Sequence, residues 1–587
     1  MLKSFFVYFK NYRGYLFAGC LCVVLESVFE LVIPLIMADI IDVGVAARDQ
    51  GYILLKGGEM VACALISLAL GLLYSRFAAV AGQGFGAELR KAEFRKVQSF
   101  SFSNLDRFST SSLVTRLTSD VTILQNAICN GIRPLVRSPV MLITAMTMSV
   151  IMSPSLALVF VAAIPLLGVC LFLILRKLRP LYGRMQKALD RVNSTVQENL
   201  IAIRVVKAYV TGDREKQKFA QVNGEFRASS ERAFHFAALN MPCFQFIMYA
   251  TILCILWFGG GLMQVGGMQV GQLTGFLSYV MQILNSLMMI SNVFMLLTRS
   301  LTSAGRIREV MDEPIGITAG DETDALTESD VLQVSRGEID FDHVYFKYSE
   351  NAEEYVLSDI CLHIEAGQTV GILGGTGSAK SSLVQLIPRL YDITGGSLSL
   401  DGRDVRDYDP AHLRDAVGMV LQKNTLFSGT VRENLRWGNE AADDAELDWA
   451  CRVACADEFL SRLPDGYDTD LGQGGVNLSG GQKQRLCIAR ALLKRPKVLI
   501  FDDSTSAVDT ATEARIRQGL EESLKDSTKI IISQRLSSLQ HADIIVILEN
   551  GRIRQTGTHQ SLLEESPLYQ DLYYSQKKGA EAGCLAQ

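Results

Sequence analysis

The sequence has no excess of basic residues. Its 57 Lys and Arg are outnumbered by 62 Asp and Glu, which gives a net charge of -5. Because nucleic-acid binding needs a concentrated basic face and no such cluster is present, nucleic acid is excluded as a partner. Charge of either sign is absent from residues 138–175 and 241–298. Together with an apolar content of 49%, these uncharged stretches exclude an ordinary soluble protein and indicate a membrane part.

Six apolar stretches in the first half are candidates for membrane spans, since a helix needs ~20 residues to cross a bilayer core. We expect the spans at residues 15–38, 60–81, 138–153, 156–175, 243–263 and 273–297. A cleavable signal peptide is the alternative for the first stretch. That stretch is too long for the apolar region of a signal peptide, and no small-residue cleavage site follows it.

The connectors between the spans predict their orientation. Residues 152–156 and 259–271 are short and uncharged, so they predict hairpins on one side of the membrane. Residues 82–137, with eight Lys or Arg, and residues 176–231 are long and charged. By the positive-inside rule these connectors and both termini lie in the cytoplasm. Segments of roughly 55 to 70 residues are too long for plain loops, which predicts that the membrane helices continue beyond the bilayer.

The second half of the chain has the composition of a soluble domain. Residues 297–314 predict a helix that ends at a proline, and the acidic, polar segment after it predicts a linker. The stretch GEIDFDHVYFKYSE, residues 337–350, alternates as a strand does. We therefore expect a transmembrane domain at 1–312, a linker at 313–336, a nucleotide-binding domain at 337–576 and a frayed tail at 577–587.

A glycine-rich turn lies between a predicted strand and a predicted helix in VGILGGTGSAKSSLVQL, residues 370–386. Backbone N–H groups in such a turn bind phosphates at the helix N-terminus. Lys380 is expected to reach the outer phosphates, Ser381 to ligate Mg²⁺ and Ser382 to add a phosphate contact. The candidate nucleotide-binding residues are Gly374, Gly375, Thr376, Gly377, Ser378, Ala379, Lys380, Ser381 and Ser382. Taken alone, the stretch is also compatible with a flexible turn between strand and helix.

Two further stretches follow in a fixed order, LSGGQKQR at 478–485 and LIFDDSTSAVD at 499–509. Together with the glycine-rich turn they resemble an ABC ATPase domain. Residues 104–121 and 198–219 resemble the two intracellular loops of ABC exporters, whose tips touch the nucleotide-binding domains. The resemblance covers nearly the whole chain. It implies a multidomain ABC exporter half-transporter: a six-helix α transmembrane domain, then an α/β P-loop ATPase domain, in a bacterial plasma membrane.

The resemblance also implies cofactors and residue roles. ATP and Mg²⁺ are the implied cofactors, and membrane lipid surrounds the first domain. Tyr348 matches the aromatic residue that stacks on adenine, and Asp502 matches the magnesium-side carboxylate. Gln422 matches the glutamine that links magnesium to the membrane domain. The implied metal ligands are therefore Ser381, Gln422 and Asp502.

Two other elements imply a dimer. Ser479, Gly480, Gly481 and Gln482 match the signature that completes a nucleotide site on the opposite subunit. Asp509 matches a loop at the dimer interface. Both roles require two ATPase domains that face each other.

Three positions in this chain's own expected ATP site depart from the family pattern. Ala379 stands in place of a P-loop glycine, Asp503 in place of the catalytic glutamate, and Gln534 in place of the histidine that contacts the γ-phosphate. Asp503 is one methylene shorter than glutamate, and a misplacement of roughly 1 Å can cost ~100-fold in rate. Glutamine forms hydrogen bonds but lacks the charge of an imidazolium.

The signature departs nowhere, so we expect a heterodimer. This chain's own site should bind ATP and hydrolyse it slowly, and its signature should complete a competent site on a second half-transporter that carries the consensus Glu and His. A homodimer with two slow sites is one alternative. A nucleotide-gated channel or regulatory subunit is another.

The substrate is expected at polar positions on the spans. Glu26 and Glu30 lie one helical turn apart on the first span, where they bind amphipathic cations or form a buried hydrogen-bonded pair. On the sixth span, Gln282, Asn285 and Asn292 combine with Met281, Met288, Met289 and Met295. Export of varied amphipathic small molecules is the leading expectation, ahead of lipid or peptide. No N-terminal peptidase domain is expected, which disfavours processed leader peptides.

The twelve cysteines form no disulfide framework. Cys451 and Cys455 share a helix face without histidine partners, so no metal site is expected there. Cys361 and Cys487 are expected inside the ATPase core, in reduced form.

Overall fold

The computed structural model describes residues 5–317, 332–504 and 508–585, without the side chains of residues 291, 292, 294, 295 and 578–585. The chain divides into two compact units, which we describe separately. The first comprises Met1–Val97 and Ser111–Asp312, and the second comprises Gln98–Thr110 and Glu313–Gln587. The short segment Gln98–Thr110 therefore belongs with the C-terminal part of the chain.

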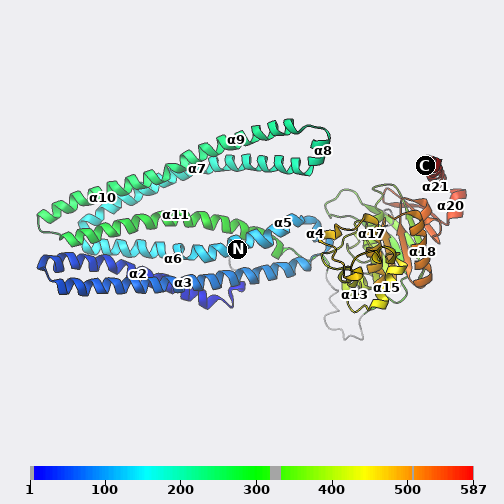
Figure 1. Ribbon diagram of the computed structural model, residues 1–587, viewed down its shortest axis with the longest axis horizontal. Helices are drawn as coiled ribbons and strands as arrows, with labels where there is room; N and C mark the ends of the chain where they lie inside the picture. The colour runs from blue at the N-terminus through cyan, green and yellow to red at the C-terminus, as the bar shows by residue number, and fades with distance from the viewer. Residues whose placement is uncertain (1–4, 318–331, 505–507, 586–587) are drawn as a thin grey trace. The chain divides into compact units, whose positions relative to one another are not determined.

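The N-terminal half is helical (Figure 1). Its elements are η1 (Phe6–Phe9), α2 (Arg13–Asp39), η2 (Ile40–Val45), α3 (Gln50–Gln98), α4 (Phe102–Arg107), α5 (Thr110–Thr115), η3 (Arg116–Asp120), α6 (Val121–Met152), α7 (Pro154–Ile201), α8 (Ile203–Ala208), α9 (Gly212–Ala238), α10 (Asn240–Gln264) and α11 (Val270–Asp312). Within the described residues, six helical segments are long and apolar enough to cross a membrane. This confirms the six predicted spans and their continuation into longer helices.

The hairpin turns are set by local sequence. Ser153 is the N-cap of α7, where its hydroxyl accepts a hydrogen bond from the Leu156 N–H, and Pro154 occupies the first helical position. The second predicted turn, residues 259–271, is shorter than expected because α10 continues to Gln264. Helices α10 and α11 approach closely at Gly259, where a Cβ would come within 2.6 Å of the Leu273 side chain. This close approach favours glycine at that position.

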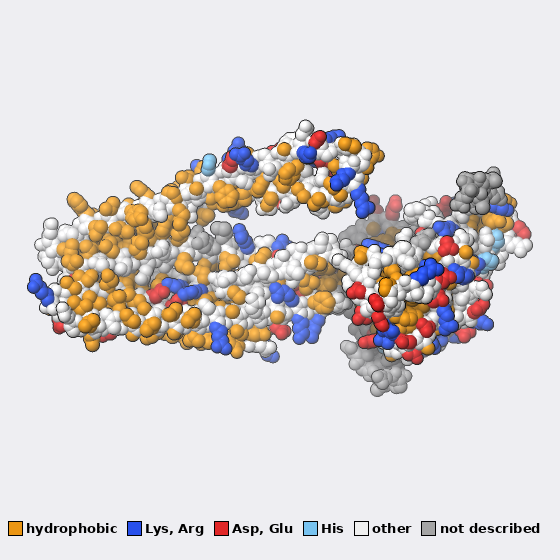
Figure 2. Space-filling model, in the orientation of Figure 1, with side chains coloured by type: hydrophobic (Ala, Val, Ile, Leu, Met, Phe, Trp, Pro, Cys, Tyr) orange, Lys and Arg blue, Asp and Glu red, His pale blue; other side chains and the backbone are white. Residues whose placement is uncertain are grey.

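The core of the first unit lies among α2, α6, α7, α10 and α11. Phe160 and Phe276 are fully buried and stack with ring centroids 5.7 Å apart. Large apolar side chains such as Trp257 and Phe246 are exposed on α10 instead. Figure 2 shows apolar side chains covering most of the visible surface of these helices. An apolar outer surface of this kind suits contact with lipid and indicates an integral membrane protein.

The second unit contains two sheets. Its strands are β1 (Ile339–Phe346), β2 (Leu357–Ile364), β3 (Thr369–Leu373), β4 (Gly395–Leu400), β5 (Arg403–Asp404), β6 (Val417–Val420), β7 (Val498–Asp502), β8 (Thr528–Ile532), β9 (Ile544–Glu549) and β10 (Arg552–Gly557). An antiparallel sheet has the order β2-β1-β4-β5. The other sheet has the order β10-β9-β3-β8-β7-β6 and is parallel except for β10.

Helices accompany these sheets along the chain. They are α12 (Lys380–Leu386), α13 (Pro410–Ala416), α14 (Val431–Arg436), α15 (Asp444–Val453), α16 (Asp457–Leu460), α17 (Gly480–Leu493), α18 (Thr510–Ser523), α19 (Leu536–Leu539), α20 (His559–Glu565) and α21 (Pro567–Leu585). All five residues of β7 are buried, as expected for a central strand covered on both faces. In such sheets ligands bind beyond the carboxyl ends of the strands, and β3, β7 and β8 end together there.

Candidate nucleotide-binding and catalytic site

A pocket of about 320 Å³ lies at the carboxyl ends of β3, β7 and β8. Its lining comes from the glycine-rich turn, the ends of two strands and the loops after β6 and β8. The lining residues are Val356, Thr376, Gly377, Ser378, Ala379, Lys380, Ser381, Ser382, Gln422, Asp502, Asp503, Ile532 and Gln534. The fold thus brings together most of the nucleotide-binding residues expected from the sequence.

The glycine-rich turn is shaped by close backbone contacts. A Cβ at Gly374 would lie 2.3 Å from the Leu548 carbonyl oxygen, so no other residue fits there. Lys380 Nζ donates hydrogen bonds to the carbonyls of Gly374 at 2.9 Å and Gly375 at 2.7 Å. Burial lowers the pKa of Lys380, and the nearby carboxylates of Asp502 and Asp503 oppose that shift. The ammonium group is therefore held over the turn where phosphates would bind.

Ala379 adopts a left-handed backbone conformation. Its φ is +70°, and it forms the N-cap of α12 without a side-chain cap. An L-residue with a Cβ pays roughly 1 kcal/mol or more in this region, a cost that glycine avoids. The departure from glycine noted in the sequence therefore introduces local strain at the phosphate-binding turn.

Ser381 and Asp502 meet in the pocket although 121 residues separate them. The Ser381 hydroxyl donates a 2.7 Å hydrogen bond to Asp502 Oδ1. Asp502 is only 4% exposed, and burial raises its pKa, an effect that the Ser381 hydrogen bond partly offsets. A hydroxyl and a carboxylate are ligands that Mg²⁺ accepts, and Gln422 adds an amide oxygen to the same pocket. These residues fit a magnesium ion bound with a nucleotide.

Asp503 and Gln534, the two other residues that depart from the family pattern, contact each other. Gln534 Nε2 donates to Asp503 Oδ2 at 3.4 Å. Asp503 has a φ of +46°, and burial raises the pKa of its carboxyl, opposed by Lys380 and Arg535. Gln576 of α21 donates its side-chain amide to the Gln534 carbonyl at 2.8 Å, which anchors the loop after β8.

Tyr348 lies beside the glycine-rich turn. Its hydroxyl and the Ser382 hydroxyl are 2.7 Å apart, and its ring is 47% exposed. The rings of Phe346 and Tyr391 pack edge-on against it, with centroids 4.9 and 5.1 Å away. The exposed face of a ring held in this way is available for stacking on a base.

The signature residues do not line the pocket. Ser479 is the N-cap of α17 and forms a capping box with Gln482, whose N–H donates to the Ser479 hydroxyl while Gln482 Oε1 accepts from the Ser479 N–H. Ser479 and Gly480 are exposed. Asp509 caps α18 by accepting from the Thr512 N–H at 3.0 Å and is also exposed. These groups lie at the surface and are available to another molecule.

Sequence reasoning missed the residues that join α4 to the ATPase fold. The Tyr391 hydroxyl donates to Asp106 Oδ2 at 2.7 Å, and the Phe102 ring packs edge-on against Tyr391 at 5.9 Å. Arg107 forms an ion pair with Glu313 at 2.7 Å. Residues 104–121 predict the first intracellular loop, but no local pattern marks Tyr391 as its partner.

A second cavity, of about 430 Å³, lies among α2, α6 and α11. Its lining includes Glu30, Arg137, Gln282 and Asn285. Among the described residues, Gln282 Oε1 is a buried oxygen without a hydrogen-bond partner. Sequence reasoning identified three of these four residues. Arg137 is the last residue of the charged connector before the third span, so its place in this cavity was not predicted.

Glu26 and Glu30 of α2 are both paired with arginines of α6. Glu26 is 3% exposed and bonds to Arg133, and it lies 3.6 Å from Arg137. Glu30 bonds to Arg137. Each of the two carboxylates therefore faces a guanidinium group. Asn292 and Met295, also expected on the substrate surface, have side chains outside the described residues.

Cys361 corrects one expectation from the sequence. It lies on the exposed face of β2, because alternation along the strand buries its neighbours Ile360 and Leu362 instead. Cys487 is buried in α17, as expected.

Comparison with known proteins agrees with this geometry. Family models match at residues 16–287, described as the ABC transporter transmembrane region, and at residues 357–506, described as ABC transporter. The chain is 40% identical to the uncharacterized ABC transporter ATP-binding protein YfiB of Bacillus subtilis, covering 95% of this chain and 96% of that protein. It is 31% identical to the putative multidrug export ATP-binding/permease protein YgaD of the same organism, covering 98% and 99%.

A solved structure has the same fold. It is a bacterial Atm1-family ABC exporter with ATP bound, which superposes with a TM-score of 0.81 at 23% identity over 96% of this chain and 99% of that one. The matches extend over the six helices and the ATPase domain alike. With its membrane region fused to a phosphate-binding ATPase domain, the chain belongs to the ABC transporter family, as an exporter half-transporter.

Proposed function

We propose that the protein exports amphipathic small molecules with energy from ATP, as one half of a heterodimeric ABC exporter. Its own ATP site binds Mg²⁺ and ATP but hydrolyses slowly, and its signature completes the active site of a partner half that has the consensus Glu and His. The limits 1–312, 313–336, 337–576 and 577–587 are the proposed domains, with both termini and the ATPase domain in the cytoplasm.

The contact between Asp503 and Gln534 is the observation that carries this proposal. Both side chains that should handle the attacking water and the γ-phosphate are replaced, and they bond to each other in the pocket. Ala379 adds a strained turn at the same pocket. The signature, in contrast, keeps its full sequence and a formed capping box. In a heterodimer, a chain can lose the residues that hydrolyse ATP in its own site and still keep the signature that completes the partner's site.

The helical cavity supports an amphipathic substrate. Its lining alternates apolar side chains such as Met141 and Met289 with Gln282, Asn285 and the Glu30–Arg137 pair. Neutral amides and a paired charge favour molecules with a dipolar or hydrogen-bonding end and an apolar body, over simple cations. The relative described as a putative multidrug exporter agrees with this substrate class.

The proposed cycle uses this chain's residues in defined roles. Lys380 and the turn N–H groups bind the phosphates of ATP, while Ser381, Asp502 and Gln422 hold Mg²⁺. Tyr348 stacks on the adenine. Closure of two ATPase domains places Ser479 to Gln482 on the partner's nucleotide, and α4 carries the movement to the membrane helices.

ATP turnover in lipid tests the proposal. The chain purified alone should release phosphate slowly, and the chain copurified with its partner half should release it rapidly. Mutation of the partner's catalytic Glu should abolish the rapid rate. Brisk turnover by the chain alone, lost on Asp503→Asn, contradicts the heterodimer. Substrate must also accumulate against its gradient in vesicles, since a nucleotide-gated channel cannot concentrate anything.

A further inference from the structure

Side chains of the types that bind metals gather on the exposed face of the β1–β2 pair. The two strands carry the sequences DFDH, residues 340–343, and DICLH, residues 359–363. The strands are antiparallel, with Asp340 opposite His363. Apolar residues of both strands, including Phe341 and Ile360, are buried in the core, so the charged and sulfur-containing side chains point to solvent.

A β-bulge places Asp342 and His343 on the same face. The register shifts between Phe341 and Val344, which are both buried, while the two residues between them are both exposed. A regular strand would put consecutive residues on opposite faces. His343 therefore has a φ of +47°, a conformation that costs of order 1 kcal/mol and that often accompanies a functional position.

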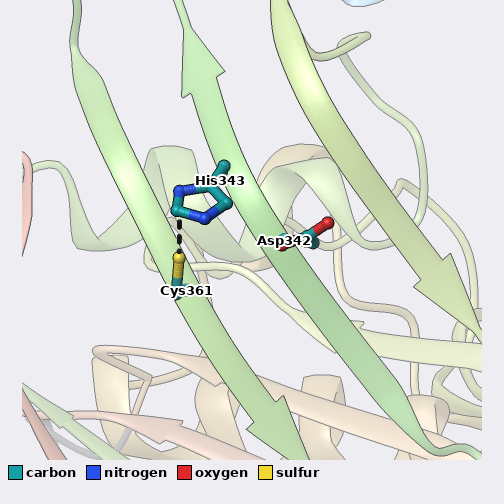
Figure 3. A group of neighbouring side chains, drawn as sticks. All are labelled: Asp342, His343 and Cys361. Carbon is teal, nitrogen blue, oxygen red and sulfur yellow. Dashed lines mark hydrogen bonds between the residues drawn. The ribbon is translucent and has the colours of Figure 1, made fainter.

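Cys361 of β2 faces this bulge. The His343 Nδ1 atom lies 3.5 Å from Cys361 Sγ, and Figure 3 shows the imidazole directly over the thiol on the neighbouring strand. Ligand atoms of Asp342, His343 and Cys361 all lie within 4.8 Å of one another. Tetrahedral bonds of about 2.0–2.3 Å would separate ligand atoms by roughly 3.3–3.8 Å. The three atoms need to close by about 1 Å, which rotations of exposed side chains supply.

Asp359 supplies a carboxylate partner for the imidazole. His343 Nδ1 and Asp359 Oδ1 are 2.6 Å apart, and Asp359 itself has a φ of +55°. The same Nδ1 atom lies 3.5 Å from Cys361 Sγ, so an ion bound between the ring and the thiol replaces the Nδ1 proton and breaks the hydrogen bond to Asp359. Two strained backbone positions on adjacent strands thus join in one hydrogen bond beside the thiol.

We propose that Asp342, His343 and Cys361 bind one borderline divalent cation, with Zn²⁺ as the favoured ion, on the outer face of this sheet. A thiolate, an imidazole and a carboxylate match the ligands of Zn²⁺, whereas Mg²⁺ and Ca²⁺ take oxygen ligands. Water completes the tetrahedron. The ion links β1 to β2 five residues before Tyr348, so it restrains the strand that leads to the adenine-stacking residue. This site is separate from the magnesium site of the nucleotide pocket.

Cobalt binding to the full chain in lipid nanodiscs, without a histidine tag and after removal of chelators, tests the site. We expect one Co²⁺ per chain, with a thiolate-to-cobalt charge-transfer band that Zn²⁺ abolishes by competition. Cys361→Ser should remove the band, and His343→Ala should weaken Co²⁺ affinity at least tenfold. Both variants should still bind ATP, which reports on folding of the domain.

Matched variants separate this site from adventitious binding. Cys254→Ser removes another exposed thiol, and His541→Ala removes an imidazole elsewhere in the ATPase domain. Both should leave the band and the affinity unchanged. Absence of a thiolate band in the unaltered chain overturns the proposal. So does a band that survives Cys361→Ser, since the cobalt would then be bound elsewhere.

Discussion

Gln534 donates its side-chain amide to the carboxylate of Asp503, joining two residues that lie 31 positions apart in the sequence. One follows β7 and the other follows β8, and these strands are neighbours in the parallel sheet. The contact orients Oδ2 of Asp503 toward an amide donor that cannot accept its proton or carry a positive charge. In the proposed function both substitutions act on the same step, activation of water beside the γ-phosphate.

Restoring the two consensus residues should accelerate hydrolysis at this chain's own site. Asp503→Glu advances the carboxylate by one methylene, and Gln534→His supplies an ionisable ring. For a misplacement of roughly 1 Å we expect a gain of up to ~100-fold for the double variant. Phosphate release by the purified chain alone in lipid measures this gain.

The same experiment carries its own control. Asp502→Asn added to the double variant should return turnover to background, because the magnesium-side carboxylate is then lost. If the double variant is no faster than the unaltered chain, the slow step lies elsewhere and our account of Asp503 and Gln534 is wrong.

Tyr391→Phe should weaken communication between α4 and the nucleotide pocket. It removes the hydroxyl that bonds to Asp106 and keeps the ring that packs against Tyr348. Hydrogen bonds to charged groups contribute about 1.5–3 kcal/mol. We therefore expect substrate stimulation of ATP turnover, measured with the partner half present, to fall about tenfold while ATP affinity is unchanged.

Tyr408→Phe is the matched control for that variant. Tyr408 is also buried in the ATPase domain, and its hydroxyl donates to the Leu400 carbonyl at 2.9 Å. Its loss should leave substrate stimulation intact. Equal losses of stimulation in both variants would mean that general destabilisation, and not the α4 contact, is responsible.

Glu26→Gln should destabilise the helical unit more than Glu30→Gln does. Glu26 is 3% exposed and contacts both Arg133 and Arg137, whose side chains are partly exposed, so its removal leaves Arg133 without its carboxylate partner. Breaking a fully buried ion pair costs about 3–5 kcal/mol, and we expect a smaller cost here because solvent screens the partly exposed Arg133. Thermal unfolding in detergent should show a lower midpoint for Glu26→Gln. The swap Glu26→Arg with Arg133→Glu should recover part of the loss, and a midpoint that does not change in Glu26→Gln contradicts the pairing.

The charge of His343 should depend on Asp359. The carboxylate accepts a hydrogen bond from the ring and raises the pKa of His343 above its usual value near 6.5. The pair therefore stabilises the fold fully at pH values below the pKa that His343 has in the unfolded chain. This stabilisation is lost as the pH rises through the raised pKa of His343 in the folded protein. Asp359→Asn should lower the pH at which His343 becomes reactive toward diethyl pyrocarbonate, followed by mass spectrometry of the His343 peptide. An identical reactivity profile in both proteins contradicts the interaction.

Local patterns predicted residues that the fold gathers in one pocket. The glycine-rich turn, Lys380 and the strand end at Asp502 are each specified by a few consecutive residues, and the parallel sheet brings such strand ends to one edge. The six membrane helices were predicted for the same reason, because apolar length is a local property. The backbone conformation of Ala379 follows from its place in the turn.

Partners distant in sequence were not predictable. Periodicity placed Glu26 and Glu30 on one helix face, but it does not identify the helix that the face meets, and their arginines lie 107 residues away on α6. Tyr391 has no motif of its own. The bulge in β1 did leave a signal, since Asp342 and His343 are consecutive polar residues in a strand that otherwise alternates.

Helix α11 runs without interruption from Val270 to Asp312, and Glu313 begins the second unit. At 1.5 Å per residue this helix is about 64 Å long. A stiff rod of that length works as a lever, since a tilt of about 5° about one end displaces the other by about 5–6 Å. A small angular change at the Asp312 end thus displaces the Val270 end by about the rise of one helical turn.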